Sequence, residues 1–294
     1  MSKPYHLCLL SLNKPKSLNE SYNSVQMMVW SLWDEFSKLP HITLEFQSIS
    51  EPLIDKQYDF VLFHSYFSND SGNCLSQMRK RVRYKTLSFL ETKANVDYCF
   101  TYLPNPHPAD SEEILLPCPT TILDSHNATK IPGSILLDHI WQPDLGTWRE
   151  LSPSLYEWFE PCHTKYSISQ LKRDPTENFP NWVLPITAKA YPIYLDSTAH
   201  FETYILTHPG TYEHSVLDMA YRGTRVLVPC VNNTLFIAKS IIDRLGLSTF
   251  STKDELLALI DAPINIMDKR GLFTSISKVV SVIDAYCQRC LDSN

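Results

Sequence analysis

YILTHPGTYEHSVLDMAYRGTRVLVP, from Tyr204 to Pro229, has the pattern of a strand, a tight turn, a helix, a second turn and a second strand. Gly210 can adopt the positive φ that a sharp corner needs, and Thr211 is a suitable N-cap for the helix. Gly223 stands where helices commonly end, and a β-branched run follows at once. The pattern predicts one parallel βαβ unit. Its corner offers free backbone N–H groups and the positive end of a helix, which suit a phosphate.

A plainer interpretation of the same corner stays open. Parallel α/β proteins contain many units of strand, glycine, helix, glycine and strand, and most of these units bind nothing. His208, at the end of the first strand, is either a donor to a phosphate oxygen or a structural turn residue. Spacing alone does not choose between these two interpretations.

The segment resembles the donor-site motif of the GT-B glycosyltransferases, in which an acid in the helix begins a run of acid-Ala-x-x-x-Gly-x-Pro-Val. The corresponding run is DMAYRGTRV, from Asp218 to Val226. The resemblance implies that Asp218 accepts hydrogen bonds from the ribose of a nucleotide sugar, with a UDP-sugar as the default donor. Met219 occupies the alanine position of the family, and Arg225 occupies its proline position. Gly210 stands where retaining members often carry a second acid, so the corner is more similar to that of inverting enzymes.

Composition sets limits on the class of protein. The chain has 294 residues, which suits two domains of roughly 130–160 residues each. Its net charge of −6 argues against a general nucleic-acid coat protein. No apolar run approaches the ~20 residues of a membrane span, and the N-terminus lacks a signal-peptide cleavage site, so a cytoplasmic location is expected. The eight cysteines are scattered, as reduced thiols are, and Cys287 and Cys290 lack a second pair for zinc.

Strands and helices alternate along both halves of the chain, which predicts an α/β protein with two Rossmann-like doubly wound domains. We expect an acceptor domain at 1–130, a donor domain at 131–272 and a final helical segment at 273–294. The resemblance implies that the domains face each other across a cleft and that the last helix crosses back to the first domain. Predicted strands include 5–11, 42–46, 58–63, 85–90, 134–138 and 165–169. Predicted helices include 25–39, 74–82, 148–159, 235–245, 253–260 and a final one from 271 to about 291.

The charge that develops on a leaving diphosphate needs cations or helix dipoles. Lys172 and Arg173 occupy a loop of the second domain where, by resemblance to the family, a basic side chain faces the diphosphate. A solvated basic pair on a surface turn is the alternative. No Asp-x-Asp pair of the kind that holds a divalent metal is present. We therefore expect a metal-independent reaction, with no cofactor other than the nucleotide sugar as co-substrate.

An inverting transferase also needs a base for the acceptor hydroxyl. Glu91 and His64 each follow a predicted strand of the first domain directly, where strand ends line the ligand crevice. Apolar neighbours of Glu91 are expected to raise its pKa by desolvation. The segment YKTLSFLETK around Glu91 also resembles the strand-end acid segment of phage DNA glucosyltransferases. Both residues have a structural alternative, as a helix cap or as a hydrogen-bonded strand end.

A basic cluster, RKRVRYK, runs from Arg79 to Lys85 on the expected acceptor domain. Arg79, Arg81 and Arg83 are candidates for contact with a polyanionic acceptor such as DNA or an acidic glycan. Such a run is also typical of a solvated helix face.

The expected function is transfer of a sugar from a nucleotide sugar to an acceptor hydroxyl, with inversion. A nucleotide-sugar epimerase of the same fold and a non-catalytic nucleotide- or glycan-binding module are the alternatives. The acceptor stays open among a glycan, a protein, a lipid and modified DNA.

Overall fold

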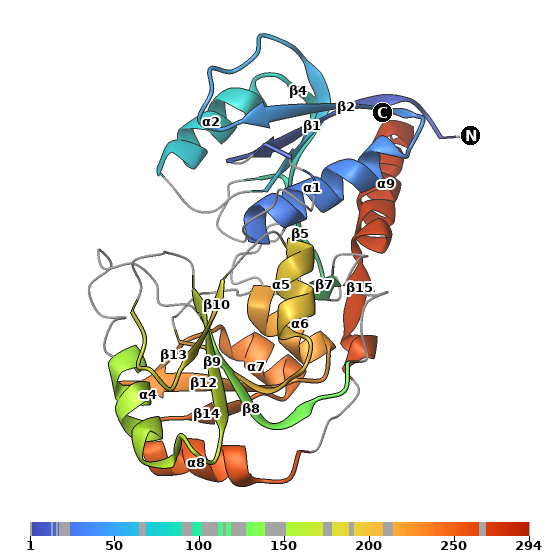
Figure 1. The fold of residues 1–294 in the computed structure, drawn as a ribbon. Coiled ribbons are helices and arrows are strands. Elements are labelled where there is room, and N and C mark those ends of the chain that lie inside the picture. The colour runs from blue at the N-terminus through green and yellow to red at the C-terminus, as the bar shows by residue number, and fades with distance from the viewer. Residues whose placement is uncertain are drawn as a thin grey trace. The chain divides into compact units, whose positions relative to one another are not determined.

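The computed structural model describes residues 2–12, 14–15, 17, 24–64, 69–89, 96–101, 111–113, 116–118, 128–138, 151–172, 178–187, 191–207, 214–264 and 269–293. Contacts divide the chain into two compact units (Figure 1). The first unit comprises Met1–Leu123 together with Phe273–Asn294, and the second unit comprises Asp124–Leu272.

The first unit is built on a parallel sheet with the strand order β2-β1-β3-β4-β5-β6 in the described residues. The order reverses between β1 and β3, so this is the switch point of the sheet. The strands are β1 (Tyr5–Ser11), β2 (Ile42–Ser48), β3 (Tyr58–Phe63), β4 (Val82–Phe89), β5 (Tyr98–Thr101) and β6 (Ser111–Glu113). The helices of this unit are α1 (Ser24–Ser37), α2 (Asn69–Arg79) and α9 (Ile276–Asp292).

The two central strands, β1 and β3, form the core of the first unit. Leu7 to Leu10 of β1 and Phe60 to Phe63 of β3 are all buried and pair in parallel register. Continuous burial, rather than alternation, is expected when helices cover both faces of a parallel sheet. The predicted strands at 5–11 and 58–63 are confirmed.

The C-terminal helix α9 belongs to the first unit and contacts α1 (Figure 1). Its apolar stripe is buried, and beside this stripe Asp284 accepts hydrogen bonds from the Tyr5 hydroxyl at 3.0 Å and from His41 Nε2 at 2.9 Å. Tyr286 stacks on Tyr98 of β5 with a centroid separation of 4.0 Å. The chain therefore returns to its first sheet after completing the second unit.

The predicted start of this last helix, at residue 271, is wrong. A 3₁₀ turn, η5 (Arg270–Leu272), and a short strand, β15 (Phe273–Ser275), come first. β15 pairs in parallel with β7 (Leu116–Cys118), and the Ser275 side chain then caps the helix by accepting from the Lys278 N–H.

The second unit is built on a second sheet with the strand order β10-β9-β8-β11-β12-β13, and β14 pairs with β12. All pairs are parallel except β12 with β13, and the order reverses between β8 and β11. The strands are β8 (Ile131–Leu137), β9 (Ser167–Lys172), β10 (Leu184–Thr187), β11 (Phe201–Ile205), β12 (Arg225–Val231), β13 (Thr234–Leu235) and β14 (Ser248–Phe250). The helical elements are α4 (Leu151–Phe159), η4 (Glu160–Cys162), α5 (Tyr191–Thr198), α6 (His214–Tyr221), α7 (Lys239–Leu245) and α8 (Lys253–Asp261).

The predicted βαβ unit is β11, α6 and β12, with the two strands parallel. α6 ends as predicted, because Gly223 has a φ of 72°. The Gly223 N–H donates to the Ala220 carbonyl at 3.2 Å, and the Thr224 N–H donates to the Met219 carbonyl at 2.9 Å. This is the left-handed glycine cap that lets a helix turn directly into a strand. The corner before α6, with Gly210 and Thr211, lies outside the described residues.

Two predicted helices are shifted in the structure. The helix expected at 235–245 starts only at Lys239, because Asn232 and Asn233 have φ values of 49° and 61° and close a tight hairpin between β12 and β13. The helix expected at 74–82 is α2, which ends at Arg79, because the chain enters β4 at Val82. In the part of the chain that the structure describes, no helix is both long and apolar enough to span a membrane.

We predict that Asp284→Ala lowers the free energy of unfolding by about 1–3 kcal/mol, because it removes the hydrogen-bond acceptor of the buried Tyr5 and of His41. Denaturant unfolding of the full chain measures this. The matched control is Asp292→Ala, at another acid of α9. It removes an exposed ion pair with Lys3 and should change the free energy of unfolding by less than about 0.5 kcal/mol. Equal effects of the two variants would show that Asp284 does not hold α9 to the sheet.

Candidate functional site

Open parallel sheets bind ligands at the carboxyl ends of their strands, at the point where the strand order reverses. In the first unit this point is the end of β1 and β3, and in the second unit it is the end of β8 and β11. Both positions carry buried polar side chains, so each unit has its own candidate site.

The first candidate site consists of Ser11 and His64. Ser11 is the last residue of β1, and His64 directly follows β3. Each stands one residue beyond the register pair of Leu10 and Phe63, and the His64 N–H donates to the Leu10 carbonyl at 2.8 Å. The two side chains are therefore neighbours at the carboxyl edge of the sheet.

Both side chains have a buried polar atom without a partner. Ser11 Oγ and His64 Nδ1 make no hydrogen bond to any residue that the structure describes. Buried polar atoms are nearly always paired with protein or ordered water, and an unpaired one costs about 1–3 kcal/mol. Two such atoms at a switch point are expected where a polar ligand or a water binds.

Burial lowers the pKa of His64 to about 4. The ring lies against Phe89 of β4, with centroids 5.9 Å apart and planes 29° apart. His64 is therefore neutral at pH 7, and its imidazole keeps a lone pair that can accept a proton. Glu91, the other predicted base, lies outside the described residues, so its role stays a prediction.

The second candidate site is a hydrogen-bonded network of Asp138, Tyr204 and Ser215. Asp138 directly follows β8 and is fully buried. The Tyr204 hydroxyl, from β11, hydrogen-bonds to Ser215 Oγ of α6 at 2.8 Å and also to Asp138. Burial, followed by the negative charge of Asp138, holds the pKa of Tyr204 well above its usual value of 10. The network joins the ends of β8 and β11 to the first turn of α6.

A further layer supports this network. The Gln170 amide of β9 donates to the Asp138 carbonyl at 3.0 Å, and the Gln170 Oε1 accepts from the Tyr156 hydroxyl of α4. The carboxyl edge of the sheet is therefore tied together across three neighbouring strands, and the chain that leaves β11 starts from a fixed position.

Sequence reasoning missed Asp138. The signal was available, because Asp138 is an acid at the end of a predicted apolar strand, the same rule that selected Glu91 and His64. Ser11 was missed as well, and its identity as a small hydroxyl within an apolar run gave little reason to single it out.

Asp218, the predicted ribose ligand, lies in α6 and is 2% exposed. It is three residues after Ser215, so both occupy one face of the helix. Its main-chain carbonyl accepts hydrogen bonds from the backbone N–H of Arg222 at 3.1 Å and from its Nε at 3.3 Å. His208, Gly210 and Thr211 lie outside the described residues, so the donor role of this corner stays a prediction.

Lys172 is the last residue of β9, at the same edge of the sheet as Asp138. Its ammonium lies 5.8 Å from the centre of the Phe179 ring. Its position agrees with a strand-end cation, but its predicted contact with a diphosphate is not tested. Arg173 lies outside the described residues.

The basic cluster lies at the opposite end of its strand. Arg79, Arg81 and Arg83 surround the start of β4, whereas the switch point is at the carboxyl ends of the strands. Each guanidinium is near an aspartate: Arg79 with Asp97 at 3.1 Å, Arg81 with Asp55 at 3.8 Å and Arg83 with Asp59 at 3.2 Å. These pairs offset part of the positive charge, and the predicted contact with a polyanionic acceptor stays untested.

Among the described residues, no group of three or more His, Cys, Asp and Glu side chains is arranged to hold a metal ion. The predicted metal independence of the reaction stays a prediction.

We predict that the low pKa of His64 makes the protein less stable in mild acid. In the unfolded chain, His64 has the ordinary histidine pKa of 6.5 and is protonated below that pH. In the folded protein, His64 is protonated only near its lowered pKa of about 4, so the unfolded chain binds one more proton between these pH values. Between pH 7 and pH 5 this costs the folded protein about 2 kcal/mol relative to a His64→Gln variant. Denaturant unfolding of both proteins at each pH measures the difference. Titration of the His64 ring near pH 6.5 by NMR would contradict this prediction.

Comparisons with known proteins support the architecture. No protein-family model matches the chain, and neither does any curated protein sequence. Several solved structures match over nearly the whole chain. The UDP-GlcNAc 2-epimerase from Methanocaldococcus jannaschii has a TM-score of 0.58 at 8% identity, over 95% of this chain and 99% of that one. S. aureus MnaA, solved with UDP, has a TM-score of 0.59 at 10% identity, over 97% of each chain.

A plant protein adds a third comparison. Arabidopsis thaliana UGT89C1, solved with UDP-L-rhamnose, has a TM-score of 0.54 at 12% identity, over 98% of this chain and 100% of that one. Together with the two parallel sheets and their switch points, these likenesses confirm the predicted fold. The chain has the GT-B fold, with two Rossmann-like doubly wound units.

Proposed function

We propose that the protein transfers a sugar from a nucleotide sugar, with a UDP-sugar as the default donor, to the hydroxyl of an acceptor. The observation that carries this proposal is that each unit has a polar site at its own switch point. Ser11 and His64 form one site, and the network of Asp138, Tyr204 and Ser215 forms the other. The proposal also draws on structures of the same fold that were solved with UDP or a UDP-sugar.

The donor binds to the second unit in this proposal. Asp218 accepts hydrogen bonds from the ribose hydroxyls, and the start of α6 faces the diphosphate with its positive end. His208, Gly210 and Thr211, in the corner before α6, donate to phosphate oxygens. Because Tyr204 hydrogen-bonds both Asp138 and Ser215, the strand that leads into this corner is fixed to the helix that leaves it. Such rigidity reduces the ordering cost of binding.

Charge on the departing diphosphate is stabilised by Lys172 and Arg173 together with the dipole of α6. The acceptor oxygen attacks the anomeric carbon from the face opposite the diphosphate. The bond from that carbon to the diphosphate oxygen breaks, and its electron pair leaves with the nucleotide. A single displacement of this kind inverts the configuration and needs no bound metal.

The acceptor hydroxyl binds to the first unit, where Ser11 Oγ hydrogen-bonds it and His64 takes its proton as the new bond forms. A pKa of about 4 keeps His64 in its basic form at neutral pH, but it also makes the imidazole a weak base. We therefore expect its contribution at the low end of the roughly 10²- to 10⁴-fold range of general-base catalysis. Glu91 is the second candidate for this role.

A nucleotide-sugar epimerase is the second candidate function, because one structure of the same fold is a UDP-GlcNAc 2-epimerase. An epimerase changes the donor without any acceptor, whereas a transferase releases UDP only as an acceptor is consumed. A non-catalytic module would bind the nucleotide and do neither. The acceptor is a glycan, a protein, a lipid or modified DNA, and Arg79, Arg81 and Arg83 are proposed contacts for an anionic one.

We predict that UDP binds the wild-type chain and that Asp218→Ala weakens this binding by roughly 1.5–3 kcal/mol, the scale of a hydrogen bond to a charged group. Isothermal calorimetry with UDP and a panel of UDP-sugars measures the affinity. Asp243→Ala is the matched control, because Asp243 is an exposed acid on the neighbouring helix α7 and pairs only with Lys239 there. Circular dichroism checks that each variant is folded. Equal affinities for wild type, Asp218→Ala and Asp243→Ala would reject the ribose contact.

We predict that His64→Gln lowers turnover by about 10²-fold and leaves UDP affinity nearly unchanged, because glutamine keeps the polar contact but cannot take a proton at pH 7. The assay follows UDP release from the donor that calorimetry identifies, with a panel of hydroxyl-bearing acceptors. In the wild type, kcat/KM should rise with pH through about 4 and then stay level, since the base acts when deprotonated.

Glu91→Gln is assayed beside His64→Gln. A loss of turnover in Glu91→Gln alone would assign the base to Glu91 instead. Near-normal turnover of both variants would exclude both residues as the base.

A further inference from the structure

The amino edge of the second sheet collects the carboxyl ends of its helices, because helices run opposite to the strands in a parallel α/β layer. Helix carboxyl ends carry partial negative charge and unpaired carbonyls, which basic side chains can satisfy. Lys130 donates to the carbonyl of Ala199, just beyond α5, at 2.8 Å. Arg222 donates to the Leu195 carbonyl, in the last turn of α5, at 2.7 Å.

Arg225 does the same for α8. Its guanidinium, from the first residue of β12, donates to the carbonyls of Leu259, Ile260 and Ala262. Three basic residues of this edge, Lys130, Arg222 and Arg225, therefore donate hydrogen bonds to carbonyls at helix ends.

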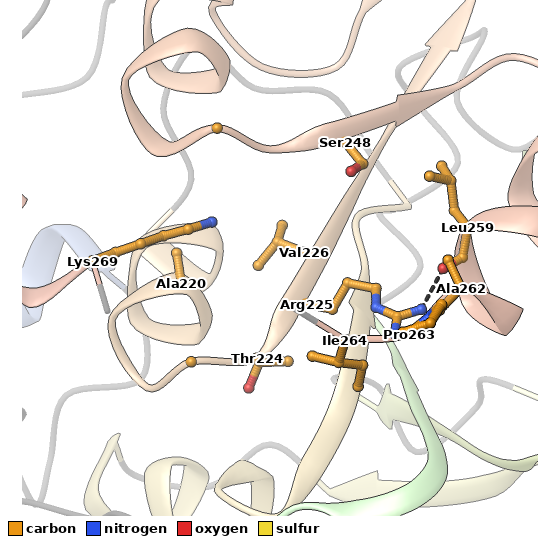
Figure 2. Close-up of a pocket in the computed structure, with 12 residues that line it drawn as sticks. Ala220, Thr224, Arg225, Val226, Ser248, Leu259, Ala262, Pro263, Ile264 and Lys269 are labelled. Atoms are coloured by element: carbon orange, nitrogen blue, oxygen red, sulfur yellow. Dashed lines mark hydrogen bonds between the residues drawn. The ribbon is translucent and has the colours of Figure 1, made fainter. Parts of the chain in front are cut away.

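Lys269 differs from them. It lines a cavity of about 200 Å³ at the amino ends of β12 and β14, and its ammonium makes no hydrogen bond or ion pair with any described residue. Figure 2 shows the lysine reaching past Ala220 toward Val226, while Arg225 turns away to the end of α8. Burial lowers the pKa of Lys269.

The apolar part of the lining includes Ala220, Val226, Leu259, Pro263 and Ile264. The polar part includes, besides Lys269, the side chains of Thr224, Arg225 and Ser248. Among the described residues that line the cavity, none is acidic. The volume is sufficient for one aromatic ring, since an apolar cavity of about 150 Å³ binds benzene.

The charges around the cavity select the kind of anion. Phosphate needs several N–H donors, and its double negative charge is unfavourable where three helices, α6, α7 and α8, end. The Arg225 guanidinium also lines the cavity, but it donates to the carbonyls at the end of α8. The Lys269 ammonium is therefore left to pair with a ligand, and one such charge beside the apolar side chains suits one negative charge on an apolar body. We propose that this cavity binds a small organic monocarboxylate, with the carboxylate paired to Lys269 and the apolar body against Val226 and Ile264.

This site lies at the amino edge of the sheet, whereas the proposed donor site lies at the carboxyl edge. It is therefore independent of the proposed function and can be tested without a nucleotide sugar. The probe is benzoate, with benzamide as its uncharged counterpart of the same shape. Calorimetry on the full chain measures both affinities, and a thermal shift reports binding to the folded state.

Wild-type protein should bind benzoate at least about 10-fold more tightly than benzamide, and Lys269→Met should remove this preference. Lys269→Arg keeps the positive charge and should retain most of it. Lys239→Met is the matched control, because it removes an exposed lysine of the same unit that pairs with Asp243. Equal binding of benzoate and benzamide by the wild type, or an unchanged preference in folded Lys269→Met, would overturn the proposal.

Discussion

Parallel strand pairing makes the two edges of each sheet chemically different, and the polar residues of the chain follow this difference. At the carboxyl edge, strand ends place Ser11, His64 and Asp138 in buried positions at the two switch points. At the amino edge of the second sheet, the helices end, and Lys130 and Arg225 donate to the carbonyls exposed there. The direction of the strands thus places the polar groups of the switch points at one edge and the basic residues that cap helix ends at the other.

The two switch points differ in how their polar groups are connected. In the second unit, the Tyr204 hydroxyl hydrogen-bonds both Asp138 and Ser215, and such a network makes the strand ends rigid. In the first unit, Ser11 Oγ and His64 Nδ1 have no partner among the described residues, at a cost of about 1–3 kcal/mol each. A rigid network suits a site that holds a large ligand in place. Unpaired atoms suit a site whose last partner arrives with the ligand.

Local patterns were enough to predict the elements that define the fold. The buried runs of β1 and β3 and the glycine that ends α6 carry their signal in a few adjacent residues, and all three were predicted correctly. The hairpin at Asn232 and Asn233 was missed, because either residue also fits a helix N-cap, and only the positive φ of both separates the two structures. α5 was not predicted, because its sequence YPIYLDST has no helical apolar stripe and is held at its carboxyl end by Arg222.

The candidate sites were harder to predict than the fold. His64 was found by its place after an apolar strand, but its partner Ser11 is distant in sequence and becomes a neighbour only through the pairing of β1 with β3. Asp138, Tyr204 and Ser215 likewise meet only because β8 pairs with β11 across the switch point. The cavity beside Lys269 depends on the ends of three helices, and no sequence pattern reports where three such ends meet.

One fold can host several reactions, so the GT-B fold cannot choose between epimerisation and transfer. The distribution of polar groups gives a reason to prefer transfer. An epimerase needs one ligand, the nucleotide sugar, whereas a transferase must also hold an acceptor hydroxyl and remove its proton. His64 is neutral and buried, and the neighbouring Ser11 hydroxyl has no partner among the residues that the structure describes. This pair has the properties that an alcohol-binding position requires, an acceptor for the proton and a second hydrogen-bonding group. Because this pair belongs to the first sheet and the proposed donor site to the second, the proposal gives each of the two ligands of a transferase a separate place in the chain.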